Sequence, residues 1–110
     1  MRRIYLAGAL NADAAGYIQN LHRMCLWAQV IKNKGFAVFI PGLDFLLGFL
    51  IGNYTYQDYF DSNQAWLECS DAIFLVPGWE LSKGVAKEIT LARKKGIPVI
   101  TKLEDLEILK

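Results

Sequence analysis

The sequence has no large cluster of basic residues. The 110-residue chain carries a formal net charge of +1, and its Lys and Arg are scattered apart from the short groups Arg2-Arg3 and Arg93-Lys94-Lys95. The second group closes a predicted helix, where cations suit the helix dipole. Because binding to a nucleic-acid polymer needs clustered Lys and Arg that displace counterions, we expect no nucleic-acid polymer as a partner.

Cysteine and histidine are scarce as well. Cys25 falls in a predicted helix and Cys69 near the end of another, with no pairing pattern between them. This favours two reduced cysteines in a cytosolic protein over a disulfide or a metal site. The single histidine, His22, lies on a polar helix face and receives no role. We therefore expect neither a metal nor a cofactor.

Long apolar runs are missing too. The most apolar run, "FLLGFLIG" at residues 45–52, is far shorter than the ~20 residues that cross a bilayer. The opening "MRRIYLAGAL" has too short an apolar part for a signal peptide with its cleavage site. These features predict a cytoplasmic protein without membrane contact.

What the chain does have is enough apolar residues, 54%, to bury a core within one domain spanning residues 1–110. Apolar runs predict four strands, at residues 3–8, 36–40, 72–76 and 97–101. Helical periodicity and capping residues predict helices at 14–34, 55–69 and 82–95, with a terminal helical turn or two at 103–109.

The strands are continuous apolar runs rather than alternating ones, which is typical of a parallel sheet covered on both faces. The sequence therefore predicts a three-layer αβα domain with a Rossmann- or flavodoxin-like parallel sheet of about four to five strands. Such sheets bind ligands beyond the carboxyl ends of their strands. In this chain those ends are marked by Gly8, Pro41-Gly42 and Pro77-Gly78-Trp79.

The segment 43–54, "LDFLLGFLIGNY", is apolar, interrupted by glycines and poorly periodic. Two interpretations remain open. It forms a loop or short helix that covers the core, or it forms a subunit interface, because exposed apolar patches of this size usually mark association.

Glu88 is the first candidate for chemistry. None of its helical neighbours three or four positions away is basic, so no helical ion pair explains it, although a solvated glutamate on the helix flank is the plainer alternative. Gly84, inside the first turn of the same helix, costs stability and suggests that a ligand or backbone approaches closely. Ser82 is a predicted N-cap, and a helix N-terminus also favours anions such as phosphate.

Asn63 is the second candidate. On its predicted helix it shares a face with apolar and aromatic residues, and a polar group there needs a partner or a cleft. Tyr5 lies within the first strand, where its hydroxyl has two possible uses: simple core packing, or reaching the ligand end of the sheet.

Together these stretches resemble a known family. "IYLAG", "LECSDAIFLVPGW" and "S-x-G-V-x-x-E" followed by "A-x-x-x-G-I-P-V" are similar to the nucleoside 2-deoxyribosyltransferase superfamily. The similarity is greatest to its small phage and bacterial members with a "PGWE-x-S-x-G" motif, and it covers most of the chain. The resemblance implies that Glu88 is the nucleophile and that Tyr5 orients it. The family aspartate that handles the base corresponds to Asn63, which is a departure because an amide cannot act as a general acid.

Ser82 stands where transferases usually have an aspartate, as in the related 2'-deoxynucleoside 5'-phosphate N-hydrolases, whose serine binds the 5'-phosphate. The resemblance therefore implies cleavage or transfer of the N-glycosidic bond of a 2'-deoxynucleoside or its 5'-monophosphate. Gly8, Trp79, Ser82 and Gly84 would bind this small molecule, Trp79 by packing on the base or sugar. Alternatively, the chain is a nucleotide-binding sensor without activity, or an assembly protein that acts through residues 43–54. We expect a homodimer or higher homo-oligomer.

Overall fold

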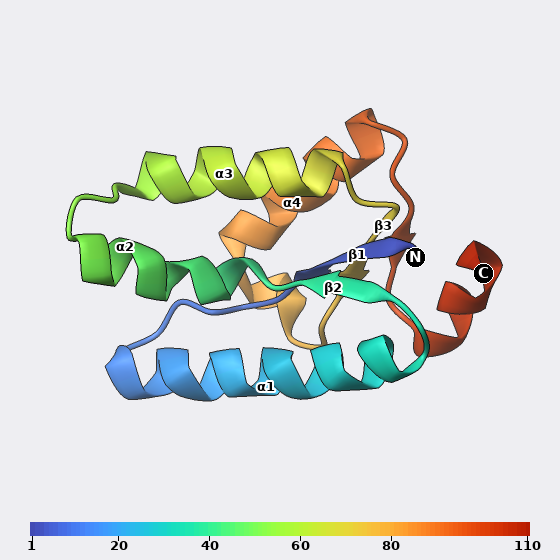
Figure 1. Cartoon of the computed structure of the whole chain (residues 1–110), viewed down its shortest axis with the longest axis horizontal. Helices are drawn as coiled ribbons and strands as arrows, with labels where there is room; N and C mark the ends of the chain where they lie inside the picture. The colour runs from blue at the N-terminus through green and yellow to red at the C-terminus, as the bar shows by residue number, and fades with distance from the viewer.

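The computed structural model describes all of residues 1–110 and has a four-stranded, all-parallel sheet at its centre (Figure 1). The strands, in the order β2-β1-β3-β4, are β2 (Ala37–Phe39), β1 (Arg3–Ala7), β3 (Ala72–Leu75) and β4 (Val99–Ile100). In β1, Ile4 pairs with Val38 on one side and with Ala72 on the other. The predicted parallel α/β sheet is confirmed, and the strand order is that of a flavodoxin-like fold.

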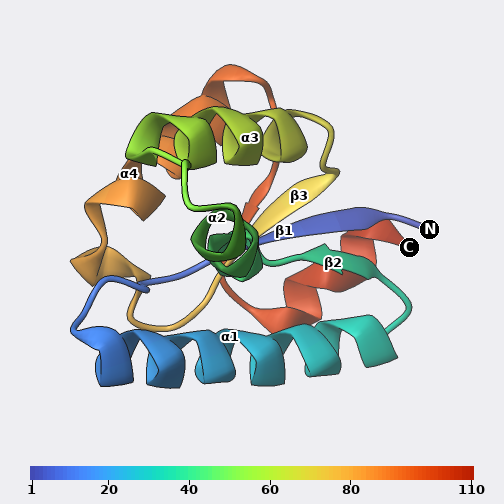
Figure 2. The ribbon, with the colours of Figure 1, turned by 60° about the vertical axis from the view of Figure 1, so that its left-hand side comes forward.

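Helices cover both faces of the sheet, which gives three layers (Figures 1 and 2). One face is covered by α1 (Ala14–Asn33) and the terminal 3-10 helix η3 (Leu103–Leu109), and the other by α3 (Tyr56–Glu68) and α4 (Lys83–Lys94). In β1, Ile4 and Leu6 belong to the core on the α1 side, whereas Tyr5 and Ala7 belong to the core on the α3 and α4 side. Alternate residues of a strand face opposite sides, so a strand covered on both sides reads as one apolar run.

The helices begin where the capping residues predict. Asp13 caps α1, with its carboxylate accepting from the amide of Gly16 at 2.8 Å. Thr55 and Asp58 form a reciprocal capping box at the start of α3. Ser82 caps α4, with its hydroxyl accepting from the amide of Val85 at 3.2 Å. None of these helices combines the length and the apolar character that spanning a membrane requires.

The segment after β2 is helical and projects from the sheet. A short 3-10 helix, η1 (Pro41–Asp44), leads into α2 (Phe45–Ile51), which Figure 2 shows nearly end-on between α1 and α3. A short helix is therefore present in the segment 43–54, as one of the two interpretations expected, but its large apolar side chains do not cover the core. Only Gly48 is buried in α2. The large apolar side chains in and just before this helix are about half exposed or more: Leu43, Phe45, Leu46, Leu47, Phe49, Leu50 and Ile51.

Candidate active site

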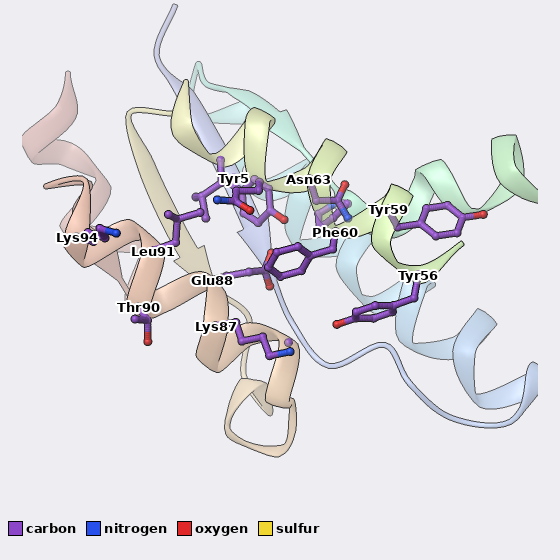
Figure 3. A pocket seen from close by; sticks show the side chains of 14 residues that line it. Tyr5, Tyr56, Tyr59, Phe60, Asn63, Lys87, Glu88, Thr90, Leu91 and Lys94 are labelled. Carbon is purple, nitrogen blue, oxygen red and sulfur yellow. The ribbon is translucent and has the colours of Figure 1, made fainter. Parts of the chain in front are cut away.

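A cavity of about 410 Å³ lies between α3 and α4, beside the carboxyl-terminal half of β1 (Figure 3). Its volume is in the range of small-molecule sites. At one end it is lined by Pro41 and Gly84, which follow the carboxyl ends of β2 and β3, and this is where open parallel sheets bind ligands. The lining residues come mainly from one face of α3 and one face of α4: Tyr5, Pro41, Tyr56, Tyr59, Phe60, Asn63, Gln64, Leu67, Gly84, Lys87, Glu88, Thr90, Leu91 and Lys94.

Glu88 extends from α4 into this cavity, on the side where Tyr5, Phe60 and Asn63 lie (Figure 3). The only ion pairs in the structure are Arg2–Asp71 and Lys110–Glu107, so no cation neutralises it. Burial raises the pKa of Glu88 to about 7, and the nearby Tyr5 hydroxyl opposes this rise. A carboxylate shielded from water and without a cation is held close to its titration point at neutral pH.

Tyr5 is fully buried in β1, and its hydroxyl lies next to the Glu88 carboxylate. The two groups do not meet in hydrogen-bonding geometry, so the hydroxyl oxygen is buried without a partner. Burial first, and the charge of Glu88 second, raise the pKa of Tyr5 far above its usual value. Tyr5 is therefore a neutral hydroxyl that is free to donate a hydrogen bond.

Asn63 reaches the same cavity from α3, and the oxygen of its side-chain amide is buried with no hydrogen-bond partner. Buried polar atoms in native proteins are nearly always hydrogen-bonded. These two atoms, from Tyr5 and Asn63, are the only buried side-chain polar atoms of the chain without a partner. Both atoms line the cavity that contains Glu88, so the buried polar groups without hydrogen-bond partners lie together at one site.

The outer part of the cavity carries positive charge. Lys87 places its ammonium 5.8 Å from the centre of the Phe60 ring, and Lys94 lines the cavity about two helical turns further along α4. Gly84 leaves open space here, because a Cβ added to it would meet only the Ser82 hydroxyl oxygen, at 3.7 Å. The glycine keeps this part of the cavity free of a side chain.

Four of the seven residues predicted from the sequence thus line one cavity, and three do not. Gly8 is packed tightly instead, because a Cβ there would lie 2.5 Å from the sulfur of Met24 and 3.2 Å from Cβ of Val76. Trp79 is half-buried in the 3-10 helix η2 (Trp79–Leu81) and packs against the core under α3 and α4. The Ser82 hydroxyl is engaged in capping α4.

A second cavity, of about 610 Å³, adjoins the first and shares four lining residues with it: Pro41, Tyr56, Tyr59 and Asn63. It lies beneath the start of α2. Its other lining residues come from α1 and the loop before it, from η1 and from the first residue of α2: Asn11, Ala12, Ala14, Tyr17, Ile18, Gly42, Asp44 and Phe45. Asp44 is half-buried in this cavity, and burial raises its pKa.

Sequence reasoning missed Asp44, although a signal for it exists. Asp44 is the only charged residue between Lys34 and Asp58, and it follows the carboxyl end of a predicted strand. A lone carboxylate in an apolar stretch at the ligand end of a sheet is a candidate on the same grounds as Glu88. No group of three or more His, Cys, Asp or Glu side chains comes together in a way that could hold a metal ion.

Comparison with known proteins supports the fold. A crystal structure of a conserved protein from Enterococcus faecalis V583 is similar to this chain, with a TM-score of 0.63 and 23% sequence identity. The match covers 92% of this chain and 62% of that protein, so the chain spans less than two thirds of its length. No curated protein matches the sequence. The family described as Domain of unknown function (DUF4406) matches residues 2–101, and the chain therefore belongs to this family.

Proposed function

We propose that the protein cleaves or transfers the N-glycosidic bond of a 2'-deoxynucleoside or its 5'-monophosphate, with Glu88 as the nucleophile. One observation carries the proposal. A carboxylate without a cationic partner lies in a cavity at the strand ends, together with the only two buried side-chain polar atoms that lack partners. This arrangement agrees with the roles that the sequence resemblance implies for Glu88, Tyr5 and Asn63.

The reaction proceeds in two displacements. The Glu88 carboxylate attacks the anomeric carbon C1', and the electron pair of the C1'–N bond leaves with the base. A covalent glycosyl ester forms through a transition state with oxocarbenium character. Water or a second base then attacks C1' and releases Glu88, so the configuration at C1' is retained. The Tyr5 hydroxyl next to the carboxylate orients it and donates to the sugar or to the departing carboxylate oxygen.

The environment of Glu88 suits this step. With a pKa of about 7, the side chain is ionised in a substantial fraction of molecules at neutral pH, and its weak solvation leaves the carboxylate reactive. Positive charge that develops on the sugar ring stabilises the ionised form further. Base release should therefore increase as the pH rises through about 7.

A 5'-phosphate has a basic region to bind. Lys87 lines the cavity on α4 one turn after Gly84, and the open space at Gly84 lies next to the N-terminus of this helix, which favours anions. In this proposal Ser82 acts through the helix that it caps, Trp79 packs against the core beside the same turn, and Gly8 lets the chain after β1 pack closely on Met24 and Val76.

The test is incubation of the protein with a panel of 2'-deoxynucleosides and their 5'-monophosphates, with free base measured by chromatography. Wild type should release base from at least one member, and Glu88→Ala should release none. Intact-mass spectrometry should detect a glycosyl adduct on the wild type only. Glu104→Gln is the matched control, because Glu104 is exposed in η3 and does not line the cavity.

Equal base release by wild type and Glu88→Ala would refute the assignment of the nucleophile.

The second candidate function is a nucleotide-binding module without catalysis. The amide of Asn63 favours it, because a neutral side chain stands where the family's aspartate would be. Such a module binds the nucleotide but releases no base, even after long incubation at high protein concentration.

We also propose that the chain forms a homo-oligomer through α2. The seven large apolar side chains in and before this helix are each about half exposed or more, and stable interfaces bury surface of this apolar kind at their centre. Monomers rarely expose one apolar patch beyond a few hundred Å². A second copy of the chain is the simplest occupant, because a two-fold axis pairs the same patch with itself. A monomer at tens of micromolar in sedimentation velocity would contradict this.

A further inference from the structure

We propose that the leaving base occupies the second cavity and that Asp44 donates a proton to it as the glycosidic bond breaks. This inference rests on the proposed function, because it assigns the acid to a reaction in which Glu88 is the nucleophile. The two cavities adjoin one another through Pro41, Tyr56, Tyr59 and Asn63. A ligand whose sugar lies beside Glu88 can therefore extend its base past these residues toward Asp44.

The second cavity suits a planar ring. Tyr17 and Phe45 lie with ring centroids 5.1 Å apart, and Phe45 and Tyr59 with centroids 6.3 Å apart and planes 26° from parallel. Tyr56 and Pro41 complete the side that faces the first cavity. Aromatic side chains bind nucleobases by stacking with little regard to sequence, because every base has a π-face. An aromatic lining of this kind suits a heteroaromatic base, which is the occupant that we assign to the cavity.

Asp44 is placed to meet such a base. It is half-buried, it forms no ion pair, and its side chain forms no hydrogen bond to another residue. It stands at the N-terminus of α2 without capping it. Burial raises the pKa of Asp44, so its protonated form persists to higher pH than that of an exposed aspartate. Three tyrosines, Tyr5, Tyr17 and Tyr59, lie close enough to sense its charge.

Tyr5 lies next to Glu88 in the first cavity. Burial first, then the charge of Glu88 and, more weakly, the charge of Asp44 raise the pKa of Tyr5. Two carboxyl groups on either side of a scissile glycosidic bond are the usual arrangement for its cleavage, one as nucleophile and the other as acid. Asn63 lines both cavities but has no proton to give. Asp44, in η1, therefore supplies the carboxyl group that is missing at Asn63 of α3.

The proton balance closes over the two displacements. In the first, the C1'–N electron pair goes to the base nitrogen while the Asp44 carboxyl transfers its proton to an acceptor atom of the base, leaving a neutral base, a glycosyl ester on Glu88 and an Asp44 carboxylate. In the second displacement, the oxygen of a water molecule bonds to C1', and the Asp44 carboxylate takes a proton from this water. The C1'–Glu88 bond breaks with its pair on the glutamate, and both carboxyl groups return to their initial states.

The test compares leaving groups. Wild type, Asp44→Asn and the control Asp61→Asn are assayed on the 2'-deoxynucleoside that the wild type cleaves fastest, and on 4-nitrophenyl 2-deoxyriboside, whose leaving group departs without protonation. Asp61 is exposed on α3 and bonds to Gln57, outside both cavities. Asp44→Asn should lower kcat/KM for the nucleoside by about 100-fold or more, lower it for the nitrophenyl glycoside by less than about 10-fold, and leave the urea midpoint nearly unchanged. Asp61→Asn should match the wild type on both substrates.

The nitrophenyl glycoside separates a chemical role from a structural one. Equal loss on both substrates would mean that Asp44 only holds the cavity in shape, and no loss on either would remove it from the reaction; each result overturns the inference while the proposed function stands. A wild type that cleaves neither substrate overturns both. Asp44→Glu keeps a carboxyl group and should recover part of the nucleoside activity that Asp44→Asn loses.

Discussion

Protonation of Glu88 is coupled to folding. In the unfolded chain the side chain titrates near the usual glutamate value of 4.5, whereas in the folded protein its pKa is about 7. Between these two values the folded state holds the proton more tightly, so the stabilising contribution is complete below the lower value and is lost as the pH rises through the upper one. The group that serves the proposed reaction therefore destabilises the ionised protein.

The first prediction follows from this coupling. Glu88→Gln removes the ionisation and its cost. The free energy of unfolding of the variant minus that of wild type should therefore be larger at about pH 8.5 than at about pH 5, by roughly 1–3 kcal/mol. Urea unfolding of both proteins at the two pH values measures this difference, and other titrating groups cancel in the comparison. A difference that does not vary with pH would mean that Glu88 is solvated in the folded protein.

The second prediction concerns the two glycines that were singled out from the sequence. Gly84→Ala adds a methyl group into open space, so it should stabilise α4 by up to about 1 kcal/mol while weakening the binding of a 5'-monophosphate. Gly8→Ala adds a methyl group against Met24 and Val76 and should destabilise the protein by about 1–3 kcal/mol. Thermal unfolding and calorimetric titration measure the two effects; tighter ligand binding by Gly84→Ala would argue against a ligand at this position.

At the residue scale, sequence reasoning identified side chains that helix periodicity places on a common face. Asn63 and Glu88 were found in this way, as polar residues on or beside apolar stripes of two helices, and the structure brings them to one cavity with Tyr5. Asp44 was missed because its segment has no clear periodicity. The lining role expected of Trp79 was not found, because a short 3-10 turn directs the indole onto the core, and loop geometry of this kind leaves no period in the sequence.

At the scale of elements, α2 is the part of the fold that the cavity depends on most. Tyr59 of α3 donates its hydroxyl to the carbonyl of Phe45 at 3.4 Å, and the same hydroxyl packs against Gly48. This contact fixes α2 relative to α3 and holds the Tyr59 ring at the junction of the two cavities. The glycine is required there because any side chain at this position would displace the tyrosine.

The third prediction tests this contact. Gly48→Ala places a methyl group onto Tyr59 and near Cβ of Tyr54, so either the ring or the helix must move. We expect a loss of about 1–3 kcal/mol of stability and faster amide hydrogen exchange in α2 than in α4. Gly48→Ala combined with Tyr59→Phe removes the colliding hydroxyl and should restore part of the loss; no recovery would locate the strain elsewhere.

The order of elements could be predicted because each signal is local. Caps at Asp13, Thr55 and Ser82 fixed the helix starts, and apolar runs located all four strands. The strands proved shorter than the runs, most clearly β4, which has only Val99 and Ile100. A run ends where hydrophobicity ends, whereas a strand ends where its neighbour stops offering hydrogen bonds. The projection of α2 depends on packing against α3, which no local signal contains.

At the scale of the whole molecule, the fourth prediction concerns association. Phe49 and Leu50 are 71% and 72% exposed in α2, so changing either to Glu should leave the fold intact and convert the homo-oligomer to a monomer in sedimentation velocity. Ile108→Glu is the matched control, because Ile108 is 75% exposed in η3. Equal sedimentation of all four proteins would exclude α2 as the interface.

The central position of β1 has a consequence for synthesis of the protein. β1 precedes both of its neighbours in the chain, yet Ile4 pairs with Ala72 and Ala7 with Leu75. Contacts this distant in sequence form late and slowly. On the ribosome, the edge of β1 that pairs with β3 therefore stays open until β3 has been made, and an unpaired strand edge of this kind is prone to aggregate. The incomplete nascent chain is thus the species of this protein most in need of a chaperone.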